Sequence, residues 1–135
     1  NPHAAAASIL SFENVVWIAG GLAKGASMHD LVKRVGKRLR GVILIGQDRA
    51  LIESELTAQF PDVPCINVDV PASYQRGGED NSFMENIVLQ AEKLAKEKDV
   101  ILLAPACASM DQFISYADRG DRFADAIRKV ISDDK

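Results

Sequence analysis

The chain has 135 residues, of which 47% are hydrophobic and 26% charged, a composition typical of one globular domain with its own core. Its 16 basic and 19 acidic residues are interspersed and give a net charge of −3, which excludes the basic block of a nucleic-acid-binding protein and the acidic tail of a disordered one. The apolar runs are far shorter than the roughly 20 residues that cross a bilayer, so we expect no membrane segment.

Two cysteines, Cys65 and Cys107, are too few for a disulfide framework, and each lies in or beside an apolar run. We therefore expect reduced, buried thiols in a cytoplasmic protein. No basic segment opens the chain, so we expect no signal peptide. The opening Asn1-Pro2-His3 lacks an initiator methionine, and we expect a domain of a longer protein.

Strand-like and helix-like patterns alternate from one end of the chain to the other. Asn1 is a candidate N-cap, and Pro2 suits the first position of a short helix. Runs rich in apolar residues predict four strands, at residues 15–19, 41–46, 64–68 and 100–104. Apolar residues spaced by three and four predict helices at residues 4–12, 28–39, 48–60 and 82–96, and a last one that opens near residue 109 and runs to about 131.

Some positions in these elements carry more specific expectations. Asp48 is expected to cap the third helix, and the loop before the fourth helix is expected at Tyr74–Asp80. Leu51, Leu89, Phe113, Tyr116, Phe123, Ile127 and Val130 are expected on buried helix faces. Gly120 is expected to interrupt the last helix, whose alternating Asp and Arg residues predict a solvated, ion-paired face.

Continuous Val, Ile and Leu strands separated by amphipathic helices predict an α/β fold with a mostly parallel sheet covered on both faces. Right-handed crossovers make it a doubly wound, Rossmann-like domain. We expect the strand order 3-2-1-4. This order would set the loops at 20–27 and 105–110 side by side at the edge where such sheets bind ligands.

The segment after the fourth strand, Pro105-Ala-Cys-Ala-Ser109, leads from small residues into a predicted helix. Backbone N–H groups and the positive end of a helix dipole would favour an anion near Ser109. Ser109-Met-Asp-Gln112 also fits the capping box Ser-x-x-Gln, in which the hydroxyl would serve the helix instead. Both interpretations stay open on the sequence alone, and the pattern favours the cap.

The glycine-rich segment Gly20-Gly-Leu-Ala-Lys24-Gly25 follows a strand but fits no nucleotide motif. A Walker loop needs Lys and then Ser or Thr after its last glycine, and the dinucleotide motif needs Gly-x-Gly-x-x-Gly. We therefore expect neither ATP nor NAD to bind through this loop. Lys24 is either a solvated turn residue or a cation at the ligand edge of the sheet.

No residue pattern predicts catalysis or metal binding within the chain. Ser109 and Cys107 lack a nucleophile elbow, and only His3 and His29 are available as bases. The two histidines and two cysteines show no metal-ligand spacing. We assign no catalytic residue and no metal site to these 135 residues.

Longer motifs resemble a known family. Residues 102–113 (LLAPACASMDQF) and 116–123 (YADRGDRF) closely resemble the end of the D-glutamate-adding Mur ligases, bacterial amide ligases of peptidoglycan synthesis. The opening Asn-Pro-His-Ala-Ala resembles the stretch after that family's Asp-Ser-Lys-Ala-Thr-Asn linker, with Asn1 as the last residue of the linker motif. Residues 17–25 resemble its Gly-Gly-x-x-Lys loop, so the matches span the chain in order.

The resemblance implies that residues 1–135 are the single, C-terminal domain of a cytoplasmic three-domain ligase and bind D-glutamate. It implies that the missing first domain binds the UDP-sugar and that the missing central domain binds ATP and Mg²⁺, so no cofactor is expected in this fragment. ATP would phosphorylate the carboxylate of UDP-N-acetylmuramoyl-L-alanine, and the amine of D-glutamate would attack the acyl phosphate. We expect the fragment alone to be an inactive monomer.

By position in the motifs, the family's D-glutamate contacts fall on Lys24, Ser109, Met110 and Tyr116, and Asn1 lies in the linker near the nucleotide. Ser109 would bind the side-chain carboxylate through its hydroxyl and N–H, Met110 would add a backbone N–H, and Lys24 would bring a positive charge. The family often has Leu at position 110, where a backbone role survives the change. It often has Phe at position 116, where Tyr116 adds a hydroxyl.

Two alternatives stay open. A Mur-type ligase for another amino acid, such as L-alanine or diaminopimelate, would share the fold, although the Pro-Ala-Cys-Ala-Ser motif argues against it. A non-catalytic module of flavodoxin-like or receiver-like type would share the strand and helix pattern. A receiver needs an acidic pair after its first strand, where this chain has Gly20-Gly21.

Overall fold

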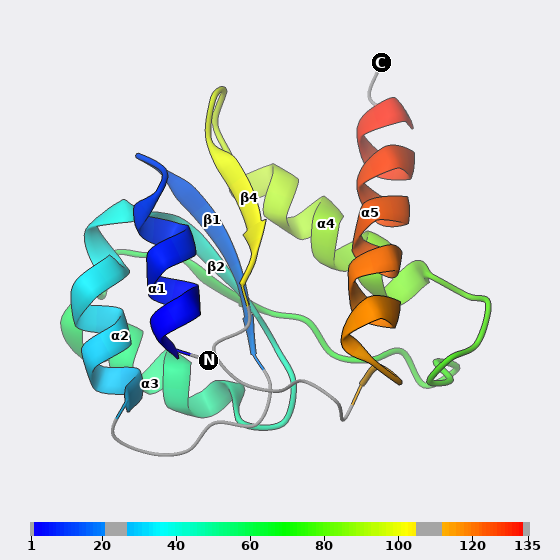
Figure 1. Cartoon of the computed structure of the whole chain (residues 1–135), viewed down its shortest axis with the longest axis horizontal. Coiled ribbons are helices and arrows are strands. Elements are labelled where there is room, and N and C mark those ends of the chain that lie inside the picture. The colour runs from blue at the N-terminus through cyan, green and yellow to red at the C-terminus, as the bar shows by residue number, and fades with distance from the viewer. Residues whose placement is uncertain (1, 21–26, 105–111, 134–135) are drawn as a thin grey trace.

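The computed structural model describes residues 2–20, 27–104 and 112–133, and its centre is one parallel sheet of four strands (Figure 1). The strands are β1 (Val15–Gly20), β2 (Leu39–Ile45), β3 (Cys65–Asn67) and β4 (Val100–Leu103). Their order in the sheet is β3-β2-β1-β4, and every neighbouring pair is parallel. The predicted α/β class and the predicted strand order are confirmed.

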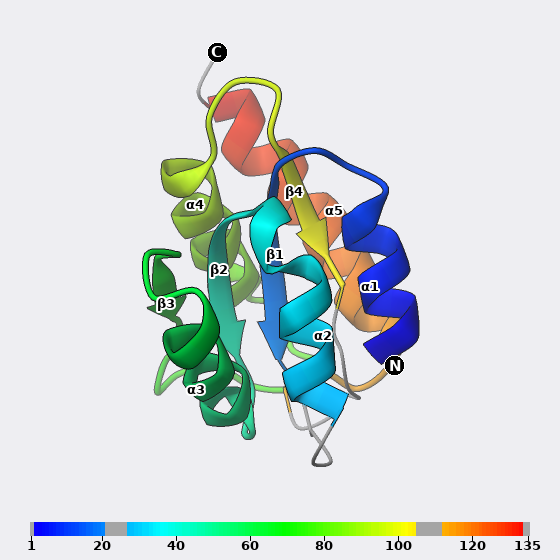
Figure 2. The same ribbon diagram turned by 90° about the vertical axis from the view of Figure 1, so that its left-hand side faces the viewer.

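Helices cover both faces of this sheet. They are α1 (Pro2–Leu10), α2 (Ser27–Val35), α3 (Arg49–Gln59), α4 (Ser82–Leu94) and α5 (Tyr116–Asp133), with a 3₁₀ turn η1 (Gly36–Arg38) before β2. Figure 2 shows α1, α2 and α3 in front of the sheet and α4 and α5 behind it. The chain passes from β1 to β2 through α2, from β2 to β3 through α3, and then returns through α4 to β4 on the other side of β1, as the right-handed crossover rule requires.

Strand β1 lies between the two layers of the core, and all six of its residues are buried. Its side chains alternate, so Trp17 packs with α1, α2 and α3, whereas Val16 and Ile18 pack with α4 and α5. The indole Nε1 of Trp17 donates a buried hydrogen bond of 2.7 Å to the carbonyl oxygen of Ala104. This bond ties the centre of the core to the chain at the end of β4.

The predicted helix at residues 28–39 is too long, because α2 ends at Val35. An ideal Cβ at Gly36 would lie 2.0 Å from the Phe60 ring, so the ring occupies the space where other residues carry a side chain. Leu39 is buried as the helical spacing predicted, but it is the first residue of β2. The buried Leu39 therefore continued the helical spacing of apolar residues beyond Val35, where the helix itself ends.

Four other helix predictions are also wrong. Leu51 and Leu89 are 44% and 39% exposed. Leu89 is two residues from the buried Ile87, a spacing that places it on the opposite side of a helix. Asp48 stands at the N-cap of α3 without a side-chain capping bond. Gly120 does not interrupt α5, which is one helix of 18 residues.

Replacing Gly20 by alanine should destabilise the fold, because an ideal Cβ there would lie 1.8 Å from the backbone oxygen of Ile45. We expect Gly20→Ala to lower the free energy of unfolding by roughly 1–3 kcal/mol, the range typical of overpacking. The matched control is Gly120→Ala, since nothing lies within 4 Å of that position. The control should raise stability by about 0.5–1 kcal/mol through helix propensity. Urea unfolding measures both, and equal effects would contradict the assigned packing.

An ion pair joins the strands at the amino end of the sheet. Arg40 Nε and Nη2 donate to Asp99 Oδ2 and Oδ1 at 2.8 and 3.3 Å. The Asp99 side chain is only 3% exposed and also accepts the backbone N–H of Lys96. The hydrogen bond from Arg40 holds the pKa of Asp99 below its usual value. The pair therefore connects β2 to the turn before β4 across β1.

This lowered pKa predicts an acid-dependent loss of stability. A carboxylate with a lower pKa in the folded state stabilises the protein fully above its unfolded-state pKa of about 4 and loses that contribution as the pH falls through the folded value. Asp99→Asn should therefore be less stable than the wild type at pH 7 and closer to it at pH 3. Asp69→Asn, at a side chain 79% exposed, is the control and should show little pH-dependent difference. Equal destabilisation by Asp99→Asn at both pH values would refute the prediction.

Candidate functional site

The carboxyl ends of β1 and β4 lie side by side at one edge of the sheet. Ile18 pairs with Leu103, and the N–H of Ala104 donates to the carbonyl oxygen of Ile18 at 3.4 Å. Residues 21–26 follow β1 and residues 105–111 follow β4, so both segments leave the sheet from adjacent strands. This is the edge and the switch point at which open α/β sheets bind their ligands.

Most of the predicted ligand residues fall in these segments. Asn1, Lys24, Ser109 and Met110 lie outside the described residues, as does Cys107. Tyr116 is the predicted contact that the structure describes, and it opens α5. The described part of the candidate site therefore consists of the carboxyl ends of β1 and β4 and the start of α5.

The residues directly after 105–111 are held firmly. Phe113 is buried and stacks on Phe83 of α4, with 6.0 Å between the ring centroids. The Tyr74 hydroxyl donates to the carbonyl oxygen of Gln112 at 2.6 Å, and Arg76 Nη2 donates to that of Phe113 at 3.1 Å. The predicted burial of Phe113 is confirmed. The loop at residues 74–80 thus anchors one end of the segment that carries Ser109.

Helix α5 begins later than the sequence predicted. Gln112 lies before the helix, and the hydroxyl of Ser115 accepts the N–H of Asp118 at 3.0 Å. A carboxylate oxygen of Asp118 accepts the N–H of Ile114 at 3.3 Å, so the cap is formed by Ser115 and Asp118. The predicted start of this helix near residue 109 is therefore wrong, and α5 is capped by Ser115 and not by a Ser109–Gln112 capping box; Ser109 itself lies outside the described residues.

Tyr116 does not belong to the core, in contrast to the prediction. It is 61% exposed, and the Arg119 guanidinium carbon lies 5.2 Å from the centre of its ring. The later start of α5 explains the difference, since Tyr116 now stands at the first helical position, beside the exposed Ile114. An aromatic ring and a cation stand together at the start of α5, close in sequence to residues 105–111.

The ion pair of Asp118 and Arg122 is largely buried, although the charge pattern predicted a solvated face. Arg122 Nε donates to Asp118 Oδ1 at 2.9 Å, and the two side chains are 11% and 15% exposed. Arg122 also donates to the carbonyl oxygens of Gly78 and Asp80, which fastens the loop at residues 74–80 to α5. The charge pattern did not predict this role. The Ser-x-x-Asp capping pattern at Ser115 was the available signal, because it marks the start of α5 and fixes Asp118, whose partner four residues later is Arg122.

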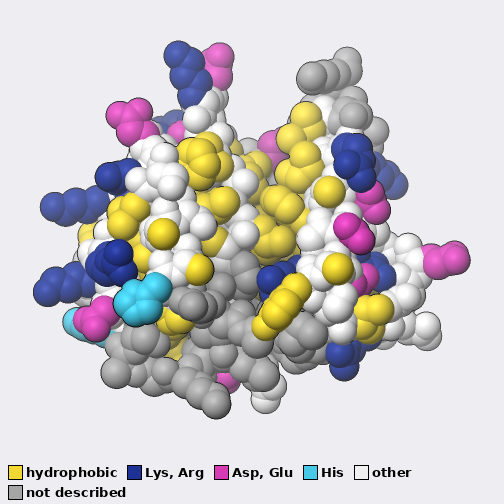
Figure 3. All heavy atoms as spheres, in the orientation of Figure 1, with side chains coloured by type: hydrophobic (Ala, Val, Ile, Leu, Met, Phe, Trp, Pro, Cys, Tyr) yellow, Lys and Arg dark blue, Asp and Glu magenta, His cyan; other side chains and the backbone are white. Residues whose placement is uncertain are grey.

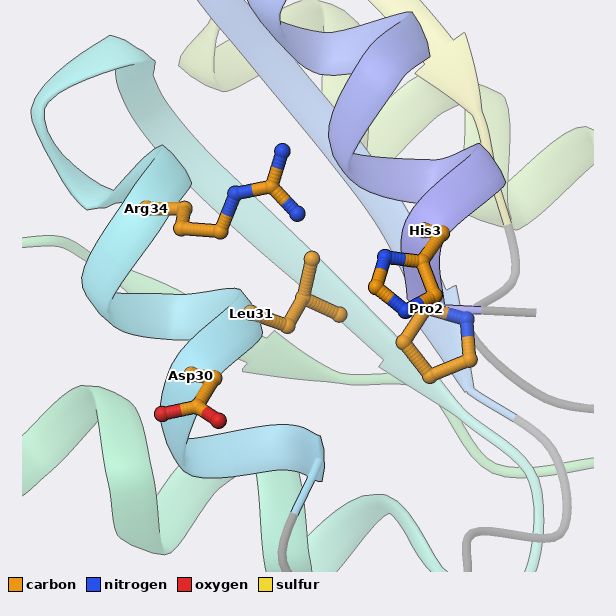
Figure 4. Close-up of a pocket in the computed structure, with 5 residues that line it drawn as sticks. All are labelled: Pro2, His3, Asp30, Leu31 and Arg34. Carbon is orange, nitrogen blue, oxygen red and sulfur yellow. The ribbon is translucent and has the colours of Figure 1, made fainter.

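Hollows lined by described residues also occur away from the ends of β1 and β4 and the start of α5, and two of them differ in size. One of about 100 Å³ between α1 and α2 is lined by Pro2, His3, Asp30, Leu31 and Arg34 (Figure 4) and is smaller than the usual ligand pocket of about 300–1,000 Å³. The other, of about 540 Å³, lies at the amino end of the sheet around Arg40 and Asp99. Neither contains a residue predicted to bind D-glutamate.

Metal and membrane features are also absent from the described ranges. Within residues 2–20, 27–104 and 112–133 no three His, Cys, Asp or Glu side chains gather as metal ligands. No helix in the same ranges is long and apolar enough to cross a bilayer.

Comparisons with known proteins decide the family. No family model matches the chain. The chain is 48% identical over 130 residues to the UDP-N-acetylmuramoylalanine–D-glutamate ligase of Streptomyces coelicolor, a match that covers 96% of the chain and 26% of that ligase. It is 50% identical to the ligase of the same name from Streptomyces avermitilis, over 95% of the chain and 26% of the relative. The chain belongs to this ligase family.

A mycobacterial relative extends the comparison. The UDP-N-acetylmuramoylalanine–D-glutamate ligase of Mycobacterium tuberculosis is 45% identical, over 97% of the chain and 31% of its own length. The resemblance to the D-glutamate-adding Mur ligases is confirmed, and the chain spans 26–31% of the length of these relatives.

The anchor of the loop at residues 74–80 can be tested through Tyr74. Tyr74→Phe removes the donor to the Gln112 carbonyl and should lower the free energy of unfolding by about 1–2 kcal/mol. Tyr116→Phe removes an exposed hydroxyl and is the matched control, with an expected change within about 0.5 kcal/mol. Thermal unfolding measures both, and equal shifts would show that the Tyr74 bond does not anchor the segment.

Proposed function

We propose that residues 1–135 form the C-terminal, D-glutamate-binding domain of a cytoplasmic, ATP-dependent ligase that joins D-glutamate to UDP-N-acetylmuramoyl-L-alanine in peptidoglycan synthesis. The observation that carries this proposal is 45–50% identity to ligases of that name over 95–97% of the chain. The fold supports it, because the two segments with the predicted ligand residues leave adjacent strands at the ligand edge of a parallel sheet.

The chemistry of D-glutamate matches the residue types in these two segments. The ligand carries two carboxylates, and a carboxylate removed from water needs charged or N–H donors, because an unpaired charge costs several kcal/mol. Lys24 supplies a cation, Ser109 a hydroxyl and an N–H, and Met110 a further N–H. Because Ser115 forms the cap of α5, the Ser109 hydroxyl is not needed to start that helix. This supports a ligand role for Ser109 over the structural one.

In the proposed reaction this domain positions the nucleophile. The terminal phosphoryl group of ATP passes to the carboxylate of the alanyl residue, and the rest of the ligase binds ATP and Mg²⁺. The D-glutamate amine then attacks the acyl carbon, and the tetrahedral intermediate expels inorganic phosphate as the amide bond forms. Holding both carboxylates of D-glutamate fixes where its amine points, which is how positioning lowers the barrier. The 135-residue chain alone is expected to have no ligase activity.

The proposal is tested in the full-length ligase by phosphate release. Ser109→Ala should raise the KM for D-glutamate and leave the KM for ATP unchanged, because it removes a donor to one substrate only. The matched control is Ser115→Ala, which removes the cap of α5. The control should lower the free energy of unfolding by about 0.5–2 kcal/mol without changing the KM for D-glutamate.

Three results would contradict the proposal or part of it. If Ser109→Ala only lowered thermal stability, Ser109 would have a structural role. If the wild-type ligase used L-alanine or diaminopimelate in preference to D-glutamate, the domain would belong to a ligase for another amino acid. Ligase activity of the 135-residue chain by itself would overturn the assignment of ATP binding to the rest of the protein.

A further inference from the structure

Positive charge is concentrated in one short part of this acidic chain. Residues 31–47 contain five basic residues and no acidic one, so this stretch carries a charge of +5. Because the whole chain carries −3, the remaining residues together carry −8. The basic residues of the stretch are Lys33, Arg34, Lys37, Arg38 and Arg40.

Three of these cations are exposed and lie outside any ion pair. Lys33 and Arg34 lie in the last turn of α2, away from its buried face, and Lys37 follows in η1. In the part of the chain that the structure describes, no carboxylate pairs with these three side chains, whereas cations on α3 and α5 do have such partners. Figure 3 shows Lys and Arg side chains gathered over α2, at the left of the molecule. Their charge is therefore available to a partner outside the domain.

An exposed aromatic ring lies beside the basic stretch. Phe12 follows α1 and is 38% exposed. Arg38 Nη1 donates to the carbonyl oxygen of Phe12 at 2.7 Å, which holds the turn after α1 against η1. Phe12 and Lys98 line the same hollow at the amino end of the sheet. Glu13 and Glu97 also line this hollow, whereas the basic stretch itself contains no carboxylate.

These residues lie at the opposite end of the sheet from the candidate site. All strands are parallel, so the segments that precede them share one edge: Phe12 precedes β1, η1 precedes β2 and Lys98 precedes β4. Helix α2 runs back from the carboxyl end of β1, so its last turn lies toward the same edge. The segments at residues 21–26 and 105–111 leave the sheet at the other edge. A partner bound at the amino edge would leave the predicted substrate edge open.

We propose that this protein binds the surface of a membrane rich in anionic lipids. The surface that makes the contact, the basic face, consists of Phe12, Lys33, Arg34, Lys37 and Arg38. Each cation near an anionic lipid surface strengthens binding by about five-fold. The ring of Phe12 enters the region between headgroups and acyl chains, while the long basic side chains reach the headgroups.

The shape of the basic face favours this partner over others. Lys33 and Arg34 stand on the outer side of a helix, and the hollow that Arg34 helps to line is too small for an ordinary ligand. An extended charged surface therefore fits better than a small anion. Single-stranded nucleic acid is bound by several aromatic rings in series, whereas one ring beside cations suits insertion among lipids.

Co-sedimentation of the protein with lipid vesicles tests the proposal. Binding to vesicles of phosphatidylglycerol mixed with phosphatidylcholine should exceed binding to phosphatidylcholine alone by at least about 10-fold at low salt. Raising the ionic strength from about 0.01 to 0.15 M shortens the Debye length from about 30 to 8 Å and should weaken the binding. Equal binding to the two kinds of vesicle, or none to the anionic one, would overturn the proposal.

Neutralising the exposed cations measures their share of the binding. The triple variant Lys33→Gln, Arg34→Gln, Lys37→Gln should bind anionic vesicles about 100-fold more weakly, because three contributions of about five-fold are lost. Its melting temperature should stay near that of the wild type, since all three side chains are exposed. Undiminished binding by this variant would refute the assignment of the basic face.

A matched triple variant controls for net charge. Lys93→Gln, Arg128→Gln and Lys129→Gln remove three exposed cations from α4 and α5, on the other face of the sheet (Figure 2). Both triple variants change the net charge from −3 to −6. The control should bind within about three-fold of the wild type. Equal losses in the two variants would show that net charge alone governs binding, and the proposal would be wrong.

The role of the aromatic ring has its own matched pair. Phe12→Ala should weaken vesicle binding by about 10-fold, because less apolar surface enters the lipid. Leu89→Ala on α4 is the control, since Leu89 is 39% exposed and Phe12 38%. The control should leave binding unchanged, and equal effects of the two substitutions would contradict insertion of Phe12.

Other outcomes separate this proposal from its alternatives. If an RNA oligonucleotide bound more tightly than anionic vesicles, and the triple variant of the basic face lost that binding, the face would belong to a nucleic acid and the proposal would fall. The vesicle measurement needs neither D-glutamate nor ATP. Vesicle binding through the basic face would therefore sustain this inference even in a ligase that uses another amino acid.

Discussion

The structure depends on the complete burial of β1 between two helical layers. Every residue of this strand is buried, and it has a paired strand on each side. Trp17 lies at its centre and can be buried only because its indole N–H reaches the Ala104 carbonyl at the end of β4. That bond joins the hydrophobic core to the first residue beyond β4. The packing of Trp17 therefore helps to fix Ala104, the residue after which the chain leaves the sheet.

A second set of contacts fixes the other end of that segment. Tyr74 and Arg76 bind the carbonyl groups of Gln112 and Phe113, and Arg122 binds those of Gly78 and Asp80. Buried carbonyl groups need such donors, and a guanidinium supplies several in fixed directions. The predicted D-glutamate residues of this segment are thus carried between two rigid anchors, the end of β4 and the start of α5. Such support suits a site that must hold a substrate amine in one direction.

Among the described strands, β4 has a sequence that is more apolar than its position at the edge of the sheet would suggest. An aliphatic strand normally lies inside a parallel sheet, yet β4 is half-buried and pairs on one side. The other edge strand, β3, is short and ends in the exposed, polar Asn67, as expected of a strand at the border of a sheet. The two edges of the sheet therefore differ in sequence, because β3 ends in a polar, exposed residue and β4 is aliphatic from Val100 to Leu103.

The sequence by itself determined the fold class, the order of the strands and the family, because aliphatic runs, crossover handedness and specific motifs are local or general signals. It also identified the segments at residues 21–26 and 105–111 as those that leave adjacent strands. Only the tertiary structure decided where α2 ends, where α5 begins and that Tyr116 is exposed. These depend on contacts between residues far apart in sequence, such as Phe60 against Gly36 and Arg122 against the loop at 74–80, and no periodicity along the chain records such contacts.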